Sequence, residues 1–309
     1  MGVEVLFLLL TGALFLGAFV TGSGSGAADE PDEEDPRVIT GTDGDDLLFG
    51  NDLDNTIIGL GGDDTIAGGP GRNLILAGDD NDTVLITSEG DTVEGGAGDD
   101  LIVSLAAYSL LDGGEGDDTL AGFFGDRLLG GAGDDYLVSQ AGQNLMRGGP
   151  GNDTLIGGDE DTLIGGEGDD VLISVARGFD AMLRSANVMR GGPGDDLLIS
   201  NGQDTLTGGS GADTFRFVDW IGEEPFNTWG TATITDFDPL RDVIEIAVPE
   251  GRPAPVLSKL PSPANNLVTL FADDVAIVTI VGQTNLDLTR IVFVPEAEAL
   301  PPLPSPAPV

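Results

Sequence analysis

The chain is dominated by a nine-residue unit that recurs in phase from Gly41 to about Phe217. Clear copies pair a glycine-rich half with alternating apolar residues, as in GGAGDDYLV from Gly130 and GGEGDDVLI from Gly165. One such unit cannot bury an apolar face alone, so neighbouring copies must stack to form a core. The repetition therefore predicts an elongated solenoid rather than a globular domain over this stretch.

The spacing of the best copies defines a longer period. They begin at positions 41, 59, 77, 95, 113, 130, 148, 165, 191 and 208, in steps of 17 or 18 residues apart from one step of 26. Two units therefore form one structural repeat, and the alternate units, such as GGPGRNLIL from Gly68, are degenerate.

The 26-residue step is interpreted as an insertion in the degenerate half. The stretch NVMRGGPGDD from Asn187 closely repeats NLMRGGPGND from Asn144, which places the extra residues between Val175 and Ser185. The phase of the repeats should therefore be unchanged. We assign Arg177, Arg184 and Arg190 to this loop, either as a solvated segment or as a docking element.

The repeats resemble the RTX, or haemolysin-type, calcium-binding nonapeptide GGxGxDxUx. The resemblance implies an all-β fold, a parallel β-roll (a β-helix-like solenoid) in which two nonapeptides make one turn. It also implies a calcium-rich main edge, formed by the good units, and a second edge formed by the degenerate units. Proteins of this class leave the bacterial cell by type I secretion and fold in external calcium.

The composition favours a cation as the small partner. Asp and Glu total 54 against 12 Lys and Arg, for a formal charge of −42, and the chain has neither His nor Cys. Nucleic acid and anionic membrane surfaces should be repelled. Thiolate and imidazole chemistry is excluded, and the remaining oxygen ligands suit calcium first and magnesium second.

The candidate metal ligands are the sixth-position aspartates of the good units. They are Asp46, Asp64, Asp82, Asp100, Asp118, Asp135, Asp153, Asp170, Asp196 and Asp213. Stacked about 4.8 Å apart, neighbouring carboxylates would repel by roughly 3 to 4 kcal/mol at an effective dielectric near 20. Folding should therefore require calcium, with at most about nine ions between successive turns.

Glycines should complete these sites. At positions one, two and four they can adopt positive φ and direct carbonyl oxygens towards an ion. The carbonyl ligands predicted in this way are those of Gly95, Gly113, Gly130, Gly148, Gly165, Gly191 and Gly208.

The eighth position of each good unit should supply the inward apolar side chain. These residues are Leu48, Ile66, Val84, Ile102, Leu120, Leu137, Leu155, Leu172, Leu198 and Phe215.

The second edge should be mainly structural. Its sixth positions are assigned to Asn55, Asn73, Asp91, Arg127, Asn144, Asp161 and Asp204. Asparagine tolerates tight turns without charge repulsion. The alternative is that Asp52, Asp54, Asp161 or Asp204 completes an occasional ion site.

The remaining sequence flanks the roll. We expect a hydrophobic helix at residues 1–20, a flexible acidic linker at 21–40, the calcium-binding roll at 41–217, a β cap at 218–294 and a proline-rich disordered tail at 295–309. The apolar N-terminus fits both a cleaved signal and a membrane anchor, with membrane contact through residues 5–20. The ADTFRF segment at the end of the roll and the TDFDP segment of the cap resemble the closing region of RTX proteins.

Three functional classes follow from these features. The first is a secreted calcium-binding protein with a structural, adhesive or interaction role towards cell-surface or matrix components. The second is a membrane-tethered calcium-binding surface protein. The third is the non-catalytic module of an extracellular enzyme, because no HExxH or GxSxG motif occurs and no enzyme activity is expected for the chain itself.

Overall fold

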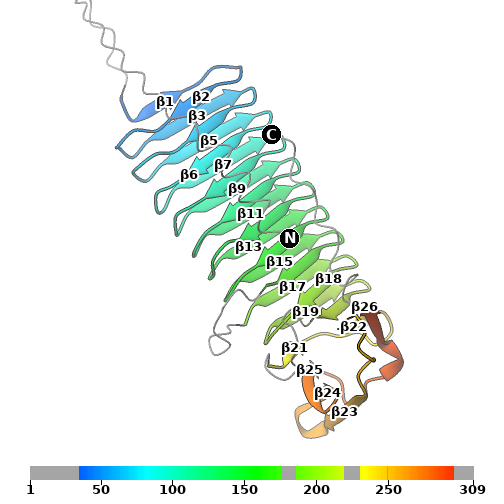
Figure 1. The fold of residues 1–309 in the computed structure, drawn as a ribbon. Coiled ribbons are helices and arrows are strands. Elements are labelled where there is room, and N and C mark those ends of the chain that lie inside the picture. Colours follow the sequence, from blue (N-terminus) through cyan, green and yellow to red (C-terminus); the bar gives the residue numbers. More distant parts are fainter. Residues whose placement is uncertain (1–34, 176–185, 219–229, 249, 296–309) are drawn as a thin grey trace, which may run out of the picture.

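The computed structural model describes residues 35–175, 186–218, 230–248 and 250–295. In this part the chain winds into a coil whose turns stack along one axis, with the earliest repeats at one end and the cap at the other (Figure 1). Each turn contributes one strand to each of two sheets. The fold is the predicted all-β parallel roll, whereas the hydrophobic helix predicted for residues 1–20 lies outside the described residues.

Sheet A contains the strands of the degenerate units and the start of each good turn. In spatial order it consists of β1 (Val38–Thr40), β3 (Thr56–Gly61), β5 (Leu74–Asp79), β7 (Thr92–Ala97), β9 (Leu110–Glu115), β11 (Arg127–Ala132), β13 (Leu145–Pro150), β15 (Thr162–Glu167), β17 (Val188–Pro193), β19 (Thr205–Ser210), β21 (Ala232–Ile234), β25 (Val275–Val281), β24 (Leu267–Ala272) and β23 (Leu257–Ser262).

Sheet B contains the strands that follow the sixth-position aspartates. In spatial order it consists of β2 (Leu47–Phe49), β4 (Thr65–Ala67), β6 (Thr83–Ile86), β8 (Leu101–Ser104), β10 (Thr119–Gly122), β12 (Tyr136–Ser139), β14 (Thr154–Gly157), β16 (Val171–Ser174), β18 (Leu197–Ser200), β20 (Thr214–Phe217), β22 (Val243–Val248) and β26 (Ile291–Pro295). Two short 3-10 segments, η1 (Pro263–Asn265) and η2 (Leu288–Arg290), lie in the cap.

The register confirms the two-unit period. Strands in one sheet pair in parallel with those one full turn away, for example Leu137 opposite Leu155 in β12 and β14. The insertion leaves this phase intact, since Leu172 of β16 lies opposite Leu198 of β18. Residues 176–185 lie outside the described residues. The assignment of Arg190 to this loop is wrong, because it lies within β17.

The core follows the strand alternation. The predicted eighth-position side chains from sheet B are all buried, at most 9% exposed, with Phe215 the largest fully buried one. They meet the inward residues of sheet A, which include Ile57, Leu111 and Met146. Because successive residues of a strand point to opposite faces, one apolar residue in two is enough to fill this narrow interior.

The cap continues and then closes the coil. Strands β21 and β22 still pair in parallel with β19 and β20, and an antiparallel meander of β23, β24 and β25 follows at the end of sheet A. The ring of Phe237 lies 6.1 Å from that of Phe215, so cap and roll share one core. Within the described part of the chain, no helix is long and apolar enough to cross a membrane.

Candidate metal-binding edge

The ten predicted aspartates lie in single file along the main edge, each directly before a strand of sheet B. We call this file the aspartate column. From Asp64 to Asp213 its members are no more than 2% exposed, whereas Asp46, at the N-terminal end of the file, is half-buried. Carboxylates are rarely buried unless they are paired or bind metal ions.

A continuous series of hydrogen bonds holds the column together. The main-chain amide of each aspartate donates to Oδ1 of the aspartate in the next turn, at 2.8 to 3.1 Å over nine consecutive pairs. The Asp213 amide then donates to Oδ1 of Asp242 at 3.1 Å. Asp242 is thus an eleventh member that sequence reasoning missed, because the turn before it is long and lacks the glycine pattern.

The second carboxylate oxygen is left without a partner through most of the column. Among the described residues, Oδ2 is buried and accepts no hydrogen bond in Asp64, Asp82, Asp100, Asp118, Asp135, Asp153, Asp170 and Asp196. A buried, unsatisfied carboxylate oxygen is costly, so a regular file of them calls for a bound cation.

The pKa values of these carboxyls reflect the same cost. Burial, reinforced by neighbouring aspartate charges, raises the pKa of Asp118 to about 8 and that of Asp135 to about 7. Burial also raises the pKa of Asp100 to about 6, with Asp99 as the charged neighbour. Without metal, the ionised carboxylates of the column are therefore disfavoured in the folded roll, and ionising them near neutral pH opposes folding.

The glycines at position one create the space beside each orphaned oxygen. A Cβ built on Gly95 would overlap both Oδ2 of Asp100 and the carbonyl oxygen of Gly113, and one built on Gly113 would overlap Oδ2 of Asp118. A carboxylate oxygen and a main-chain carbonyl therefore converge on one cradle, as calcium coordination requires.

Positive φ is not the reason for glycine at position one, contrary to the sequence analysis. Glycines at positions two and four do adopt it, as Gly131 (φ 124°) and Gly133 (φ 140°) show, whereas Gly130 does not. Position one needs glycine for room rather than for backbone freedom. In the described residues no group of three or more acidic side chains is placed to hold a metal ion.

The second edge has the same turn-to-turn series of main-chain amide hydrogen bonds, but its side chains find their remaining partners within the protein. Asp126, Asp161 and Asp204 accept hydrogen bonds at Oδ2 from the Phe123 amide, the Gly158 amide and the Ser200 hydroxyl. Their carboxylates are therefore satisfied within the protein, which fits the structural reading of this edge.

Asparagines take the donor role on the second edge. The side-chain amide of Asn187 donates to the Gly158 carbonyl at 2.7 Å and to the Ser174 hydroxyl at 2.8 Å. It thus ties neighbouring turns together without a metal. Asp91 differs from the other acids of this edge, because its buried Oδ2 has no partner among the described residues.

The assignment of Arg127 to the second edge is wrong. Asp126 occupies that position and receives the Ser109 amide at 2.8 Å, while Arg127 is the exposed first residue of β11. The unit from Gly122 lacks one residue, and the turn absorbs the deletion because Leu128 must remain inside the core. Asn187 and Ser109 fill two further positions of this file.

A third ladder, also missed, runs outside the aspartate column. From Asp63 onwards, the fifth-position residue of each good unit is exposed and its amide donates to the preceding turn, as in Asp134 to Oδ1 of Asp117 at 2.8 Å. The column runs in the opposite sense, towards the following turn. The recurring Asp-Asp pair in the sequence is the signal for this division, since the two aspartates bind opposite neighbours.

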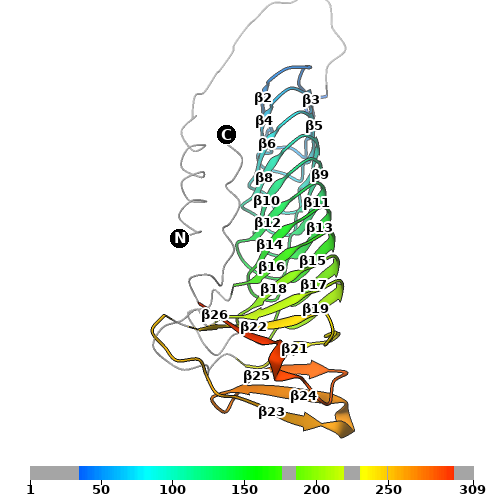
Figure 2. The same ribbon diagram turned by 90° about the vertical axis from the view of Figure 1, so that its right-hand side faces the viewer.

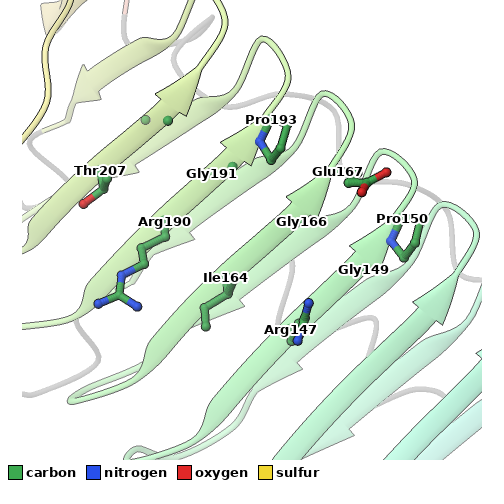
Figure 3. Close-up of a pocket in the computed structure, with 13 residues that line it drawn as sticks. Arg147, Gly149, Pro150, Ile164, Gly166, Glu167, Arg190, Gly191, Pro193 and Thr207 are labelled. Atoms are coloured by element: carbon green, nitrogen blue, oxygen red, sulfur yellow. The ribbon is translucent and has the colours of Figure 1, made fainter.

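A shallow groove of about 500 Å³ lies on the outward face of sheet A. Figure 3 shows Arg147 and Arg190 on either side of Ile164 along its floor. Its lining contains one acidic side chain, Glu167, two arginines, and glycines from four successive strands of sheet A.

Comparisons with known proteins agree with this arrangement. The model of the RTX calcium-binding nonapeptide repeat matches residues 38–52, 49–84, 87–120, 121–155, 155–174 and 184–215, more than half of the chain. No curated protein matches the chain.

Two solved structures are similar to parts of the chain. The AlgE6R3 subunit from the Azotobacter vinelandii mannuronan C5-epimerase is 27% identical over 44% of this chain and 77% of its own, with a TM-score of 0.32. The extracellular lipase LipA from Serratia marcescens is 16% identical over 78% of this chain and 45% of its own, with a TM-score of 0.22.

Proposed function

Because this chain belongs to the family with RTX calcium-binding nonapeptide repeats, we propose that it is a secreted bacterial protein whose roll assembles on calcium outside the cell. The observation that carries the proposal is the file of buried Oδ2 atoms that lack a partner. A metal-free roll at neutral pH would keep these charges stacked, and the cation removes that penalty.

The ligands assigned in this proposal are the ten column aspartates and the position-one carbonyls. Calcium would supply positive charge between successive turns, where Oδ2 and a carbonyl oxygen share one cradle. From Asp64 to Asp196, the chain's own part is to hold each Oδ1 on the amide of the preceding column aspartate, which leaves Oδ2 free for the ion. Asp46 differs, because its Oδ2 accepts hydrogen bonds from the Thr42 amide and hydroxyl.

The role outside the cell is proposed to be structural or adhesive, towards surface or matrix components. Release of the native protein into culture medium, rather than retention in the membrane fraction, is the result expected from secretion.

A calcium titration tests the central claim. Purified chain in chelator should have a disordered circular dichroism spectrum and gain β-structure cooperatively in millimolar calcium, with calorimetry counting the ions. Magnesium at the same concentration is the control, and it should act weakly because its octahedral shell suits this edge poorly. A compact, calcium-independent roll in excess EDTA at neutral pH would overturn the proposal.

A further inference from the structure

The outward face of sheet A carries charges that its own chain leaves unpaired. One outward row crosses six successive strands in register, from β7 to β17: Glu94, Asp112, Leu129, Arg147, Ile164 and Arg190. Within the described part of the chain, none of its four charged side chains forms an ion pair. The whole sequence has 54 acidic residues and 12 basic ones, so unpaired arginines on this face call for a reason.

The charges of this row are separated by sign. Glu94 and Asp112 lie directly opposite each other on neighbouring strands, and like charges in that position destabilise a sheet. Burial and the charge of Glu94 raise the pKa of Asp112, as expected for an acid without a partner. Arg147 and Arg190 lie at the other end, two strands apart, or about 9.6 Å. The row therefore has an acidic half and a basic half.

The basic half lies along the groove on the outward face of sheet A. Arg147, Ile164 and Arg190 form one row in Figure 3, and Pro150 and Pro193 stand in a second row beyond the glycines. Because glycine has no side chain, the surface between the rows is low and can receive side chains from outside. The described strands of the cap lie at the end of the roll and do not cover this face (Figures 1 and 2).

We propose that the outward face of sheet A binds a second copy of this chain, with the two roll axes antiparallel and related by a two-fold axis that runs along the strands between β11 and β13. A second copy repeats its outward residues at the same strand spacing of about 4.8 Å, so the two rows stay in register. Glu94 then lies opposite the partner's Arg190. Asp112 lies opposite the partner's Ile164, between the two arginines, and by symmetry each contact occurs twice.

The side chains around the axis fit this pairing. Leu129 and Leu145 are half-buried in the single chain and lie next to the axis, which gives the interface an apolar centre. The exposed Arg127 of β11 faces the partner's Leu145 rather than another arginine. Glu115 faces the partner's Glu167, but this like-charge pair lies at the exposed rim, where water screens it.

The size of the face and the net charge both permit association. From β5 to β19 the face measures about 34 Å by about 20 Å, or roughly 1,400 Å² for both copies, within the range of stable interfaces. The formal charge of −42 opposes association, but about nine calcium ions on the main edge would remove about 18 of these charges. At physiological ionic strength the remainder is screened beyond about 8 Å. Association therefore rests on the proposed function, because only the calcium-folded roll should dimerise.

Sedimentation analysis of the full chain in millimolar calcium tests the dimer, with circular dichroism reporting on the fold in the same samples. Folded protein should dimerise with a micromolar or tighter Kd. Arg190→Glu and Glu94→Arg should each raise that Kd at least about tenfold, because each substitution places like charges opposite each other twice. Arg252→Glu, an exposed charge reversal in the cap, is the control matched to Arg190→Glu and should change the Kd by less than about twofold.

A mixture of the two weakened variants gives the sharpest measurement. Arg190→Glu and Glu94→Arg chains in equal amounts should form heterodimers. The two substituted side chains then attract each other across one contact, and the unchanged Glu94 and Arg190 pair across the other.

Three results would overturn the proposal. Calcium-folded protein that stays monomeric at about 0.1 mM would leave the arginines to a foreign acidic partner. A dimer that Arg190→Glu does not weaken would use another face, and a mixture that fails to associate would contradict the antiparallel pairing. A chain that does not fold in calcium would instead contradict the proposed function, and the dimer that depends on it, through its circular dichroism spectrum.

Discussion

Mild acidification should stabilise the metal-free roll and so replace part of the effect of calcium. The pKa values of the column give the direction in which its stability changes with pH. Burial raises the pKa of Asp82, Asp170 and Asp213 to about 7 and that of Asp153 and Asp196 to about 6. In the unfolded chain an aspartate titrates near 3.9. The folded, metal-free roll therefore binds more protons than the unfolded chain, so its stability falls as pH rises from about 4 to about 8.

The magnitude is large for a domain of this kind. For each carboxyl with a folded pKa of about 7, lowering the pH from 7.5 to 5.0 stabilises the folded state relative to the unfolded chain by roughly 2.7 kcal/mol, at 1.36 kcal/mol per pH unit below the folded pKa. Screening by water at the edge reduces this to on the order of 1 kcal/mol. Several such groups together still contribute several kcal/mol, which is comparable to the ~5 to 15 kcal/mol that stabilises a whole domain.

The assay compares the chain in EDTA at pH 7.5 and pH 5.0 by circular dichroism and by scattering. At pH 5.0 the exposed acids remain charged and the pH stays above the sequence pI of about 4.1, so the protein should remain soluble. We expect compact β-structure to appear at pH 5.0 without calcium and to disappear as the pH passes from 6 to 8.

High salt at pH 7.5 distinguishes the contribution of the aspartate column to unfolding from the contribution of the overall net charge. One molar salt reduces the Debye length to about 3 Å and relieves long-range repulsion, but it does not protonate buried carboxyls. If salt alone restores the roll, net charge and not the column opposes folding. A chain that is equally disordered at both pH values in EDTA would refute the electrostatic reasoning.

Two substitutions, each with a control variant, test the edge at single positions. Asp118→Asn, in mid-column, should weaken calcium-induced folding and lower the number of bound ions measured by calorimetry by about one to two. Asp117→Asn, the control at the exposed neighbour, should leave the ion count unchanged, and equal effects would contradict the distinction between the two ladders. Gly131→Ala should destabilise the calcium-bound roll by several kcal/mol in urea, because its Cβ would overlap the Gly114 carbonyl at a φ of 124°. Gly44→Ala, with nothing within 4 Å, is its control and should change stability by less than about 1 kcal/mol.

The interior and the position of the column could be predicted because both depend on period alone. Once Leu137 and Leu155 are placed inside, strand alternation and the two-unit turn determine which strand residues between them face the interior. The error at Arg127 arose where a turn lost one residue, because counting from the glycines and counting from Leu128 then disagree. The core residue sets the register, and the turn adapts.

Other features could not be predicted, because they depend on where a second atom lies. Asp161 and Asp170 are both sixth-position aspartates, yet Oδ2 of Asp161 accepts the Gly158 amide and Oδ2 of Asp170 accepts nothing. Only three-dimensional placement separates a self-satisfied carboxylate from one that needs an ion. Likewise, the sequence shows that Ile156 faces outward but not that its side chain is buried.

The Asn187 hydrogen bonds on the second edge use a neutral donor and need no ion: its side-chain amide donates to the Gly158 carbonyl and to the Ser174 hydroxyl. Chelation therefore removes stabilising contacts from one edge of each turn only. Because each turn of a solenoid is stabilised only by its neighbours, loss of that one edge is enough to unfold the stack, in line with the disordered spectrum expected in chelator. The two edges of one turn thus divide the work between an ion-dependent side and an ion-independent side.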